Sequence, residues 1–183
     1  MEALQDPVVE GFPKLRTLLR DVGVPGSGSF AVSHKAMQAA YDGRTADVEA
    51  WLHEVGAPGY VNAYYSPGSD DREGVTLLMA AAFHGREALV RTLLRREVPA
   101  WVEQPSRVPQ NNGLGSISTP LIAAASEGQL GVVSAMLEHA DSVHKSEYVK
   151  ESMLCRQNEF GQTAVYVAAP AGHAQPVAHQ RRA

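Results

Sequence analysis

The chain has 183 residues, of which 44% are hydrophobic and 20% are charged, and its formal net charge is −4. This length allows one ordinary domain or one short repeat array with its own core, so extensive disorder is not expected. Lys and Arg form no long block, which argues against nucleic acid or an anionic membrane as the partner.

The single cysteine, Cys155, excludes an intrachain disulfide and favours a reducing compartment. We therefore expect an intracellular protein, located in the cytoplasm. The acidic amino terminus lacks the apolar core of a secretory signal. The longest apolar stretches, around 77–83 and 121–125, are too short to cross a bilayer.

Residues 1–33 are predicted to form a degenerate amino-terminal cap and a linker. Leu15, Leu18 and Leu19 lie at helical spacing, and Gly23 follows where a turn would end the helix. Residues 24–29 have the Gly/Ser-rich composition of a flexible connector.

Alanine runs recur through the rest of the chain, at residues 39–40, 80–82, 123–125 and 168–169. Each run is followed, three residues after its last alanine, by a glycine, and these glycines are spaced by 42, 43 and 44 residues: Gly43, Gly85, Gly128 and Gly172. Apolar pairs follow the first three glycines at constant distance: Trp51-Leu52, Leu93-Leu94 and Met136-Leu137. Clustered small residues that repeat in this way indicate closely packed helices in an internal repeat.

Each unit is predicted to be a helix, a tight turn, a second helix and a long loop. In the second unit, Thr76 can cap the first helix and Gly85 can end it in a left-handed conformation. The third unit begins with Thr119-Pro120, where the missing proline N–H costs nothing at the first helical position. The apolar faces of the two second helices are formed by Leu89, Val90, Leu93 and Leu94, and by Leu130, Val133, Met136 and Leu137.

These units resemble the ankyrin repeat family. Residues 74–85 read GVTLLMAAAFHG, residues 119–128 read TPLIAAASEG, and residues 161–169 read GQTAVYVAA, while residues 36–43 match more weakly. The resemblance covers about residues 34–177 and implies an all-α, ankyrin-type helical solenoid of antiparallel helix pairs with long hairpin-like loops.

The resemblance also implies the domain organisation. We expect repeats at about 34–70, 71–115 and 116–157, and an incomplete repeat at 158–183. Leu18 and Trp51 are 33 residues apart, as are Gly23 and Gly56, and 33 is the basic period of the family. Residues 7–23 are therefore interpreted as the degenerate cap.

The chain departs from the family pattern in its loops and at one histidine position. The loops 61–74, 102–117 and 143–161 are long, and we expect the extra residues to lie in fingers between repeats. Where the family has a histidine that bonds to a neighbouring repeat, this chain has Met37, Met79, Ile122 and Tyr166. We therefore expect apolar burial to carry more of the stability.

The fourth repeat is incomplete in the sequence. Pro170 falls in the last turn of its first helix, and no Leu-Leu pair follows. We expect Val165 and Ala168 to face solvent or another chain, so that self-association through this repeat is one expected partner contact.

Candidates for chemistry lie near residues 139–155. Cys155, His144 and Asp141 are the residue types of a thiol nucleophile, its base and an orienting carboxylate, but all three fall in one predicted loop without a local signature. His139, Asp141 and His144 lack the spacing of metal ligands, so no metal is expected. Residues 26–28 are not followed by the lysine and helix of a phosphate-binding loop, so no cofactor is expected.

Exposed aromatic residues are the candidate partner contacts. Phe83 and His84 precede a turn glycine, where the resemblance implies that side chains can face a concave groove or pack against the next repeat. Aromatic residues on the first two fingers either contact a partner or pack the fingers together. The expected partner-binding set is Tyr41, Tyr60, Tyr64, Tyr65, Phe83, His84, Trp101 and Glu127.

The resemblance implies a non-catalytic protein–protein interaction module that binds a protein partner through a concave groove and finger loops. The alternative is a regulatory or targeting ankyrin segment of a longer multidomain protein or enzyme. A third hypothesis is a small enzyme built on the Cys155 loop. Thiol labelling that finds Cys155 inert at neutral pH would exclude it.

Overall fold

The computed structural model describes residues 31–56, 58–65, 74–96, 100–110, 113–144 and 147–169. Most of the predicted cap and linker therefore lies outside the described residues, and so do Pro170 and the residues after it. The helices, in chain order, are α3 (His34–Asp42), α4 (Thr45–Val55), α5 (Leu77–Phe83), α6 (Glu87–Leu94), α7 (Pro120–Ser126), α8 (Leu130–His144), α9 (Glu147–Cys155) and α10 (Ala164–Ala168). A 3-10 helix, η1, spans Pro58–Asn62, and the strands are β1 (Tyr64–Tyr65), β2 (Val75–Thr76), β3 (Ser106–Gln110) and β4 (Gly113–Ser118).

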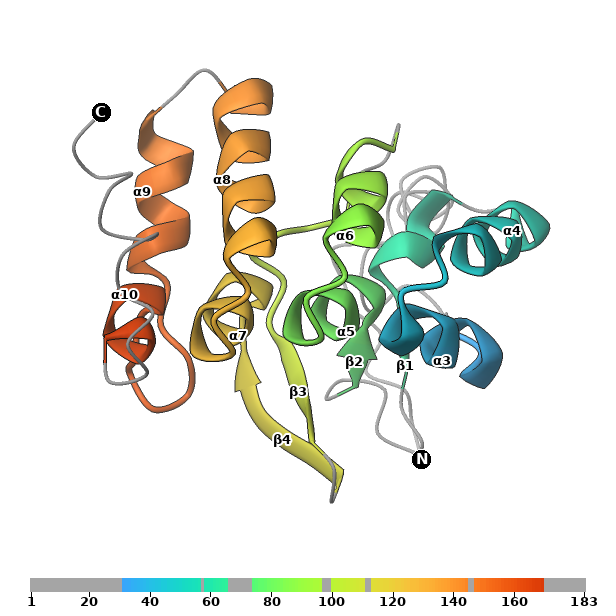
Figure 1. Cartoon of the computed structure of the whole chain (residues 1–183), viewed down its shortest axis with the longest axis horizontal. Coiled ribbons are helices and arrows are strands. Elements are labelled where there is room, and N and C mark those ends of the chain that lie inside the picture. Colours follow the sequence, from blue (N-terminus) through green and yellow to red (C-terminus); the bar gives the residue numbers. More distant parts are fainter. Residues whose placement is uncertain are drawn as a thin grey trace, which may run out of the picture.

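The helices lie in two rows (Figure 1). The first row contains α3, α5, α7 and α10, and each of these helices contacts the next one in the row. The second row contains α4, α6, α8 and α9, which also contact one another in that order. The fold is therefore a helical repeat in which each pair packs against its neighbours.

The repeat helices begin and end at the residues that the sequence predicts. The hydroxyls of Thr76 and Thr119 accept the backbone N–H groups of Met79 at 3.1 Å and Ile122 at 3.3 Å. Gly85 has φ +67°, a left-handed conformation that ends the turn after α5. These local signals are confirmed in both central repeats.

Thr76→Ala is expected to leave the chain less stable than Thr76→Ser by about 1 kcal/mol, because alanine removes the capping oxygen while serine keeps it. Both variants lose the same buried methyl group, so their difference isolates the cap. Urea unfolding followed by circular dichroism measures it. Equal stabilities would show that the hydroxyl does not stabilise α5.

The core lies between the two rows and is rich in alanine. Residues 80–82 and 123–125 are at most 2% exposed, which lets the first-row helices approach closely. The predicted apolar faces of α6 and α8 are buried, except that Leu130 is 50% exposed because it is the first residue of α8, beside the turn. Met37, Met79 and Ile122, at the position of the family histidine, are buried apolar residues.

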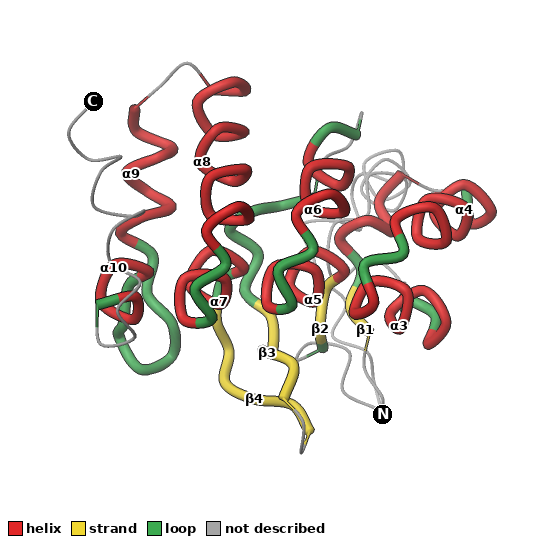
Figure 2. The backbone as a smooth tube through the Cα atoms, in the orientation of Figure 1, coloured by secondary structure: helices red, strands yellow, loops and turns green. Residues whose placement is uncertain are grey.

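The predicted loop at residues 143–161 is wrong, because most of it is helical. Helix α8 continues to His144, and α9 then runs antiparallel to it at the end of the second row (Figure 2). Met153 and Leu154 are 1% and 5% exposed, so α9 is packed into the core. It contacts both α8 and α10, the place that a second helix of the fourth repeat would take.

The expectation that Ala168 faces solvent is also wrong. Ala168 is fully buried and Val165 is partly buried against the core, because α10 packs on α7 and contacts α9. Tyr166, by contrast, is 60% exposed.

Short antiparallel strands form the fingers (Figure 2). Strand β1 pairs with β2, with Tyr64 opposite Thr76, and β3 pairs with β4, with Ser106 opposite Ser118. The second finger is thus a hairpin, in which Gly113 begins β4. The Arg107 N–H donates to the carbonyl of Gly74 at 3.1 Å, which joins neighbouring fingers.

Candidate functional site

Aromatic rings from two repeats meet at the carboxyl ends of α3 and α5. Tyr41 and His84 are in edge contact with ring centroids 5.3 Å apart, and His84 meets Phe83 at 5.1 Å. On the finger side, the Tyr65 hydroxyl is 2.8 Å from Nδ1 of His34. We call these five residues (His34, Tyr41, Tyr65, Phe83 and His84) the aromatic strip.

Burial and neighbouring charges set the electrostatics of the aromatic strip. Burial, followed by the nearby Tyr65, raises the pKa of Tyr41 above its ordinary value. Burial, followed by Arg86, lowers the pKa of His84, while the carboxylates of Glu127 and Asp42 oppose that shift. The lowered pKa favours the neutral His84 imidazole, which can both donate and accept a hydrogen bond.

Glu127 extends this surface into the third repeat. It directly precedes the turn glycine Gly128, as His84 precedes Gly85, and it lies close enough to His84 to act on its pKa. Its side chain is exposed and makes no hydrogen bond or ion pair with the described residues. Its carboxylate is thus available to a partner.

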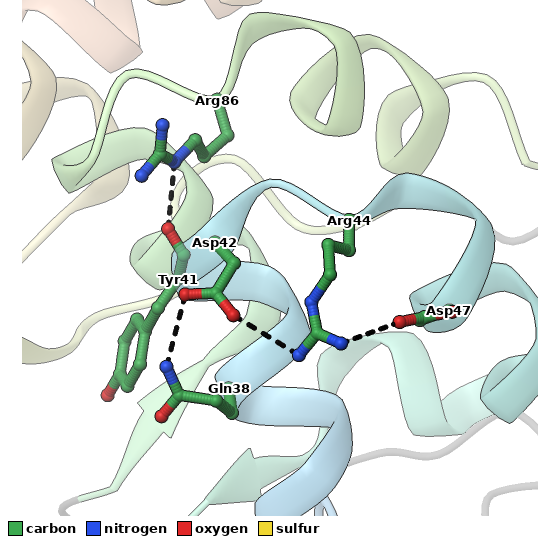
Figure 3. Close-up of polar contacts among 6 residues, drawn as sticks. All are labelled: Gln38, Tyr41, Asp42, Arg44, Asp47 and Arg86. Carbon is green, nitrogen blue, oxygen red and sulfur yellow. Dashed lines mark hydrogen bonds and ion pairs between the residues drawn. The ribbon is translucent and has the colours of Figure 1, made fainter.

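A polar network holds the turn beside Tyr41 (Figure 3). The Arg44 guanidinium contacts the carboxylates of Asp42 at 3.2 Å and Asp47 at 2.9 Å, and Gln38 Nε2 donates to Asp42 Oδ1 at 3.1 Å. Arg86, from the next repeat, donates through Nε to the main-chain oxygen of Tyr41 at 2.8 Å. The end of α3 is therefore fixed both within its repeat and by its neighbour.

The contact made by Arg86 recurs one repeat later. Gln129, which follows Gly128 as Arg86 follows Gly85, donates through Nε2 to the main-chain oxygen of Phe83 at 3.5 Å. A Cβ atom on Gly43 would lie 2.8 Å from Cδ of Arg86, so the arginine passes directly over that glycine. Side chains after the turn glycine thus supply the contacts between repeats that the missing family histidine does not, and they fix the spacing of the aromatic strip.

The predicted finger aromatics largely contact their own chain. Tyr60 stacks edge-on with Trp51 at 5.9 Å, and the Tyr64 hydroxyl donates to the carbonyl of Pro105 at 2.9 Å. Trp101 differs, because it is 40% exposed. Its backbone N–H donates to Asn62 Oδ1 at 2.8 Å, which fixes its position. The eight predicted partner contacts therefore lie in three places. One group surrounds His84, Tyr64 and Tyr65 lie on β1, and Tyr60 and Trp101 lie at η1.

Several positioning residues were not predicted. His34, Arg86, Gln129 and Asn62 hold the candidate partner contacts in place. The sequence does carry a signal for the positioning role of Arg86 and Gln129, because each is a polar residue directly after the turn glycine of its repeat.

The candidates for chemistry are not in a loop. Asp141 lies in α8 and forms an ion pair with Lys150 of α9 at 3.1 Å, while Cys155 is the exposed last residue of α9. Within the described residues, no group of three His, Cys, Asp or Glu side chains could hold a metal ion. In the same part of the chain, no helix has the length and apolar character needed to cross a bilayer.

The second row carries its own ion-pair network. Arg91 of α6 contacts Glu87 at 2.8 Å and Glu138 of α8 at 2.7 Å, beside a surface cavity of about 260 Å³. The hydrogen bond from Arg91 lowers the pKa of Glu138 below its ordinary value. The charge of Arg91 is thus balanced by two carboxylates at this surface.

Comparison with known families identifies one match. The family model of ankyrin repeats, with three copies, matches residues 36–147. This segment contains α4 to α8, all of α3 but its first two residues, and every member of the aromatic strip except His34. No curated protein matches the chain.

Proposed function

Since this chain belongs to the ankyrin repeat family, whose repeats are generally protein–protein interaction modules, we propose that it is a non-catalytic solenoid that binds a protein partner. In this proposal the first-row helices and the fingers form a concave groove. The proposed contact residues are Tyr41, Phe83, His84 and Glu127, the finger residues Tyr64 and Tyr65, and Tyr60 and Trp101 at η1. The single cysteine supports a site of action in the cytoplasm.

The edge-packed cluster of Tyr41, His84 and Phe83 supports this proposal most strongly. Aromatic side chains are favoured anchors at interfaces, since they bring large contact area at little entropic cost. Here the rings are already held against one another, and Arg86 fixes the backbone behind Tyr41. A preorganised surface loses little freedom on binding, so more of the contact energy appears as affinity. The same surface would serve if the array targets or regulates a longer protein.

Affinity capture with a double variant tests the proposal. His84→Ala with Glu127→Ala removes two exposed side chains and should reduce specific partner recovery at least about tenfold, the effect of losing roughly 1.4 kcal/mol. A matched control, His53→Ala with Glu54→Ala, changes two exposed residues of α4 in the second row. Partners that bind the double variant as well as the wild type would contradict the proposal.

Tyr41→Phe supplies a second, milder variant. It keeps the half-buried ring and removes only the hydroxyl, so it separates a role of the ring from a role of its polar tip. Thermal melts of every variant show whether the fold is kept. Equal binding by folded variants changed at Tyr41, His84 and Glu127 would place the partner contact elsewhere.

A further inference from the structure

Two serine side chains lie opposite each other at the base of the second finger, the hairpin of β3 and β4 (Figure 2). Ser106 is the first residue of β3, Ser118 is the last residue of β4, and the two are paired across the hairpin. Side chains of directly opposite residues point to the same face of an antiparallel pair, with Cβ atoms about 4.5–5.5 Å apart. Here that face is the inner one, because Ser106 is 2% exposed and Ser118 is 4% exposed. The two hydroxyls are therefore neighbours inside the protein.

The protein around these two hydroxyls does not satisfy them. Within the described residues neither Ser106 Oγ nor Ser118 Oγ has a hydrogen-bond partner, so the two oxygens do not bond to each other. Buried polar side-chain atoms nearly always have a partner, which is either another protein group or an ordered water. Two hydroxyls on neighbouring Cβ atoms that do not bond directly are spaced for one small bridging molecule.

Gln104 adds a third polar atom to this place. It lies two residues before Ser106, so the two Cα atoms are at most about 7 Å apart. Residues 104, 106 and 108 are buried while residues 105 and 107 are more exposed, which places Gln104 on the same inner face. Nε2 of Gln104 donates to the main-chain oxygen of Asn62 at 3.0 Å, and this bond identifies Oε1 as the remaining acceptor. Oε1 is buried and has no hydrogen-bond partner in the described part of the chain.

The first finger shows that this position does not need a polar residue. Val75 directly precedes the capping Thr76, as Ser118 precedes the capping Thr119. Val75 is fully buried, so the backbone accommodates an apolar side chain here. The serine of the second finger differs from that valine in being able to bind a polar molecule.

We propose that the base of the second finger holds one buried water molecule, bound by Ser106 Oγ, Ser118 Oγ and Gln104 Oε1. Such a water donates to Gln104 and to one serine and accepts from the other, which makes about three hydrogen bonds, the usual number for a buried water. All three protein atoms are uncharged, so a bound ion would find no compensating charge. The water joins β3 to β4, and through Gln104 it connects the hairpin to Asn62 of η1 in the preceding repeat.

Oxygen-17 magnetic relaxation of the full chain in solution, which counts long-lived internal waters, tests this proposal. We expect Ser106→Ala with Ser118→Ala to lose one such water, because a single partner does not hold it. Ser106→Ala with Ser118→Val, which copies the valine of the first finger, should lose it as well. The matched control is Ser126→Ala, because the Ser126 hydroxyl already donates to the carbonyl of Ala123 at 2.9 Å, and it should keep the count of the wild type. Equal counts in the wild type and in either folded double variant overturn the proposal, as when the two hydroxyls turn to bond each other.

Urea unfolding of the same variants gives a second measurement. Because both serines bind one water, the effect of Ser106→Ala with Ser118→Ala on the unfolding equilibrium constant should differ from the product of the single effects by more than about twofold. The effects of Ser106→Ala and Ser126→Ala should instead multiply, because Ser126 lies at the other end of α7 from Ser118 and bonds to its own helix. Independent effects of Ser106→Ala and Ser118→Ala would also overturn the proposal.

Discussion

Replacing Ala124 with leucine should lower the free energy of unfolding by about 1–3 kcal/mol, because the added carbons have no space in a filled core. Ala124 is fully buried in α7, which packs between α5 and α10. The leucine must therefore push neighbouring first helices apart or adopt a strained rotamer. Urea unfolding followed by circular dichroism measures the change.

Ala50→Leu is the matched control, because Ala50 is exposed on α4. The same substitution there should change the stability by no more than about 0.5 kcal/mol, as for most surface sites. Equal effects at Ala50 and Ala124 would mean that the alanine runs reflect helix propensity and not close packing between repeats.

Met153→Ala should destabilise the chain by about 2–5 kcal/mol, the range for large-to-small changes in a core. Met153 is 1% exposed on α9, which contacts α8 and α10. Loss of its side chain leaves a cavity where α9 closes the second row. The same urea unfolding experiment measures this change. The slope of the unfolding free energy against urea concentration is compared between the variants.

Met153→Leu nearly conserves the side-chain volume and should cost less than about 1.5 kcal/mol. It separates a packing defect at α9 from a general intolerance of change at this position. If Met153→Ala were as stable as the wild type, α9 would not be part of the cooperative core, and the described end of the second row would be incorrect.

The repeat helices could be predicted because their signals are local. A capping threonine, a left-handed glycine and apolar residues at helical spacing each act within a few residues, as Thr76, Gly85 and Leu93 do. Their recurrence in successive repeats made the prediction robust. Leu130 was misplaced because helical spacing alone does not say which turn of the helix is covered.

Helix α9 was not predicted, because the expected repeat pattern placed a finger loop there. Its burial depends on α8 running on to His144 and on contacts with α8 and α10, which are tertiary relations and not properties of the α9 sequence alone. The chain does carry a local signal, since Val149 and Met153 are four residues apart and could share a helix face. Ala168 is buried for the same tertiary reason.

The exposed residues of the candidate site could be predicted from the sequence, whereas the residues that hold them in position could not. Phe83 and His84 are marked by their position before a turn glycine. The contact of His84 with Tyr41, however, joins residues 43 positions apart, and the hydrogen bond from Arg86 to Tyr41 joins residues 45 positions apart. Only the packing of one repeat against the next brings these residues together. The charge environment of His84 therefore becomes visible only in the structure.

Amide hydrogen exchange of the Ala124→Leu variant, compared with the wild type, tests most directly whether neighbouring repeats stabilise one another. The repeats are coupled in this account, so protection should fall in α5 (Leu77–Phe83) and α10 (Ala164–Ala168) as well as in α7 itself. A loss of protection confined to residues 120–126, with α5 and α10 exchanging as in the wild type, would contradict it.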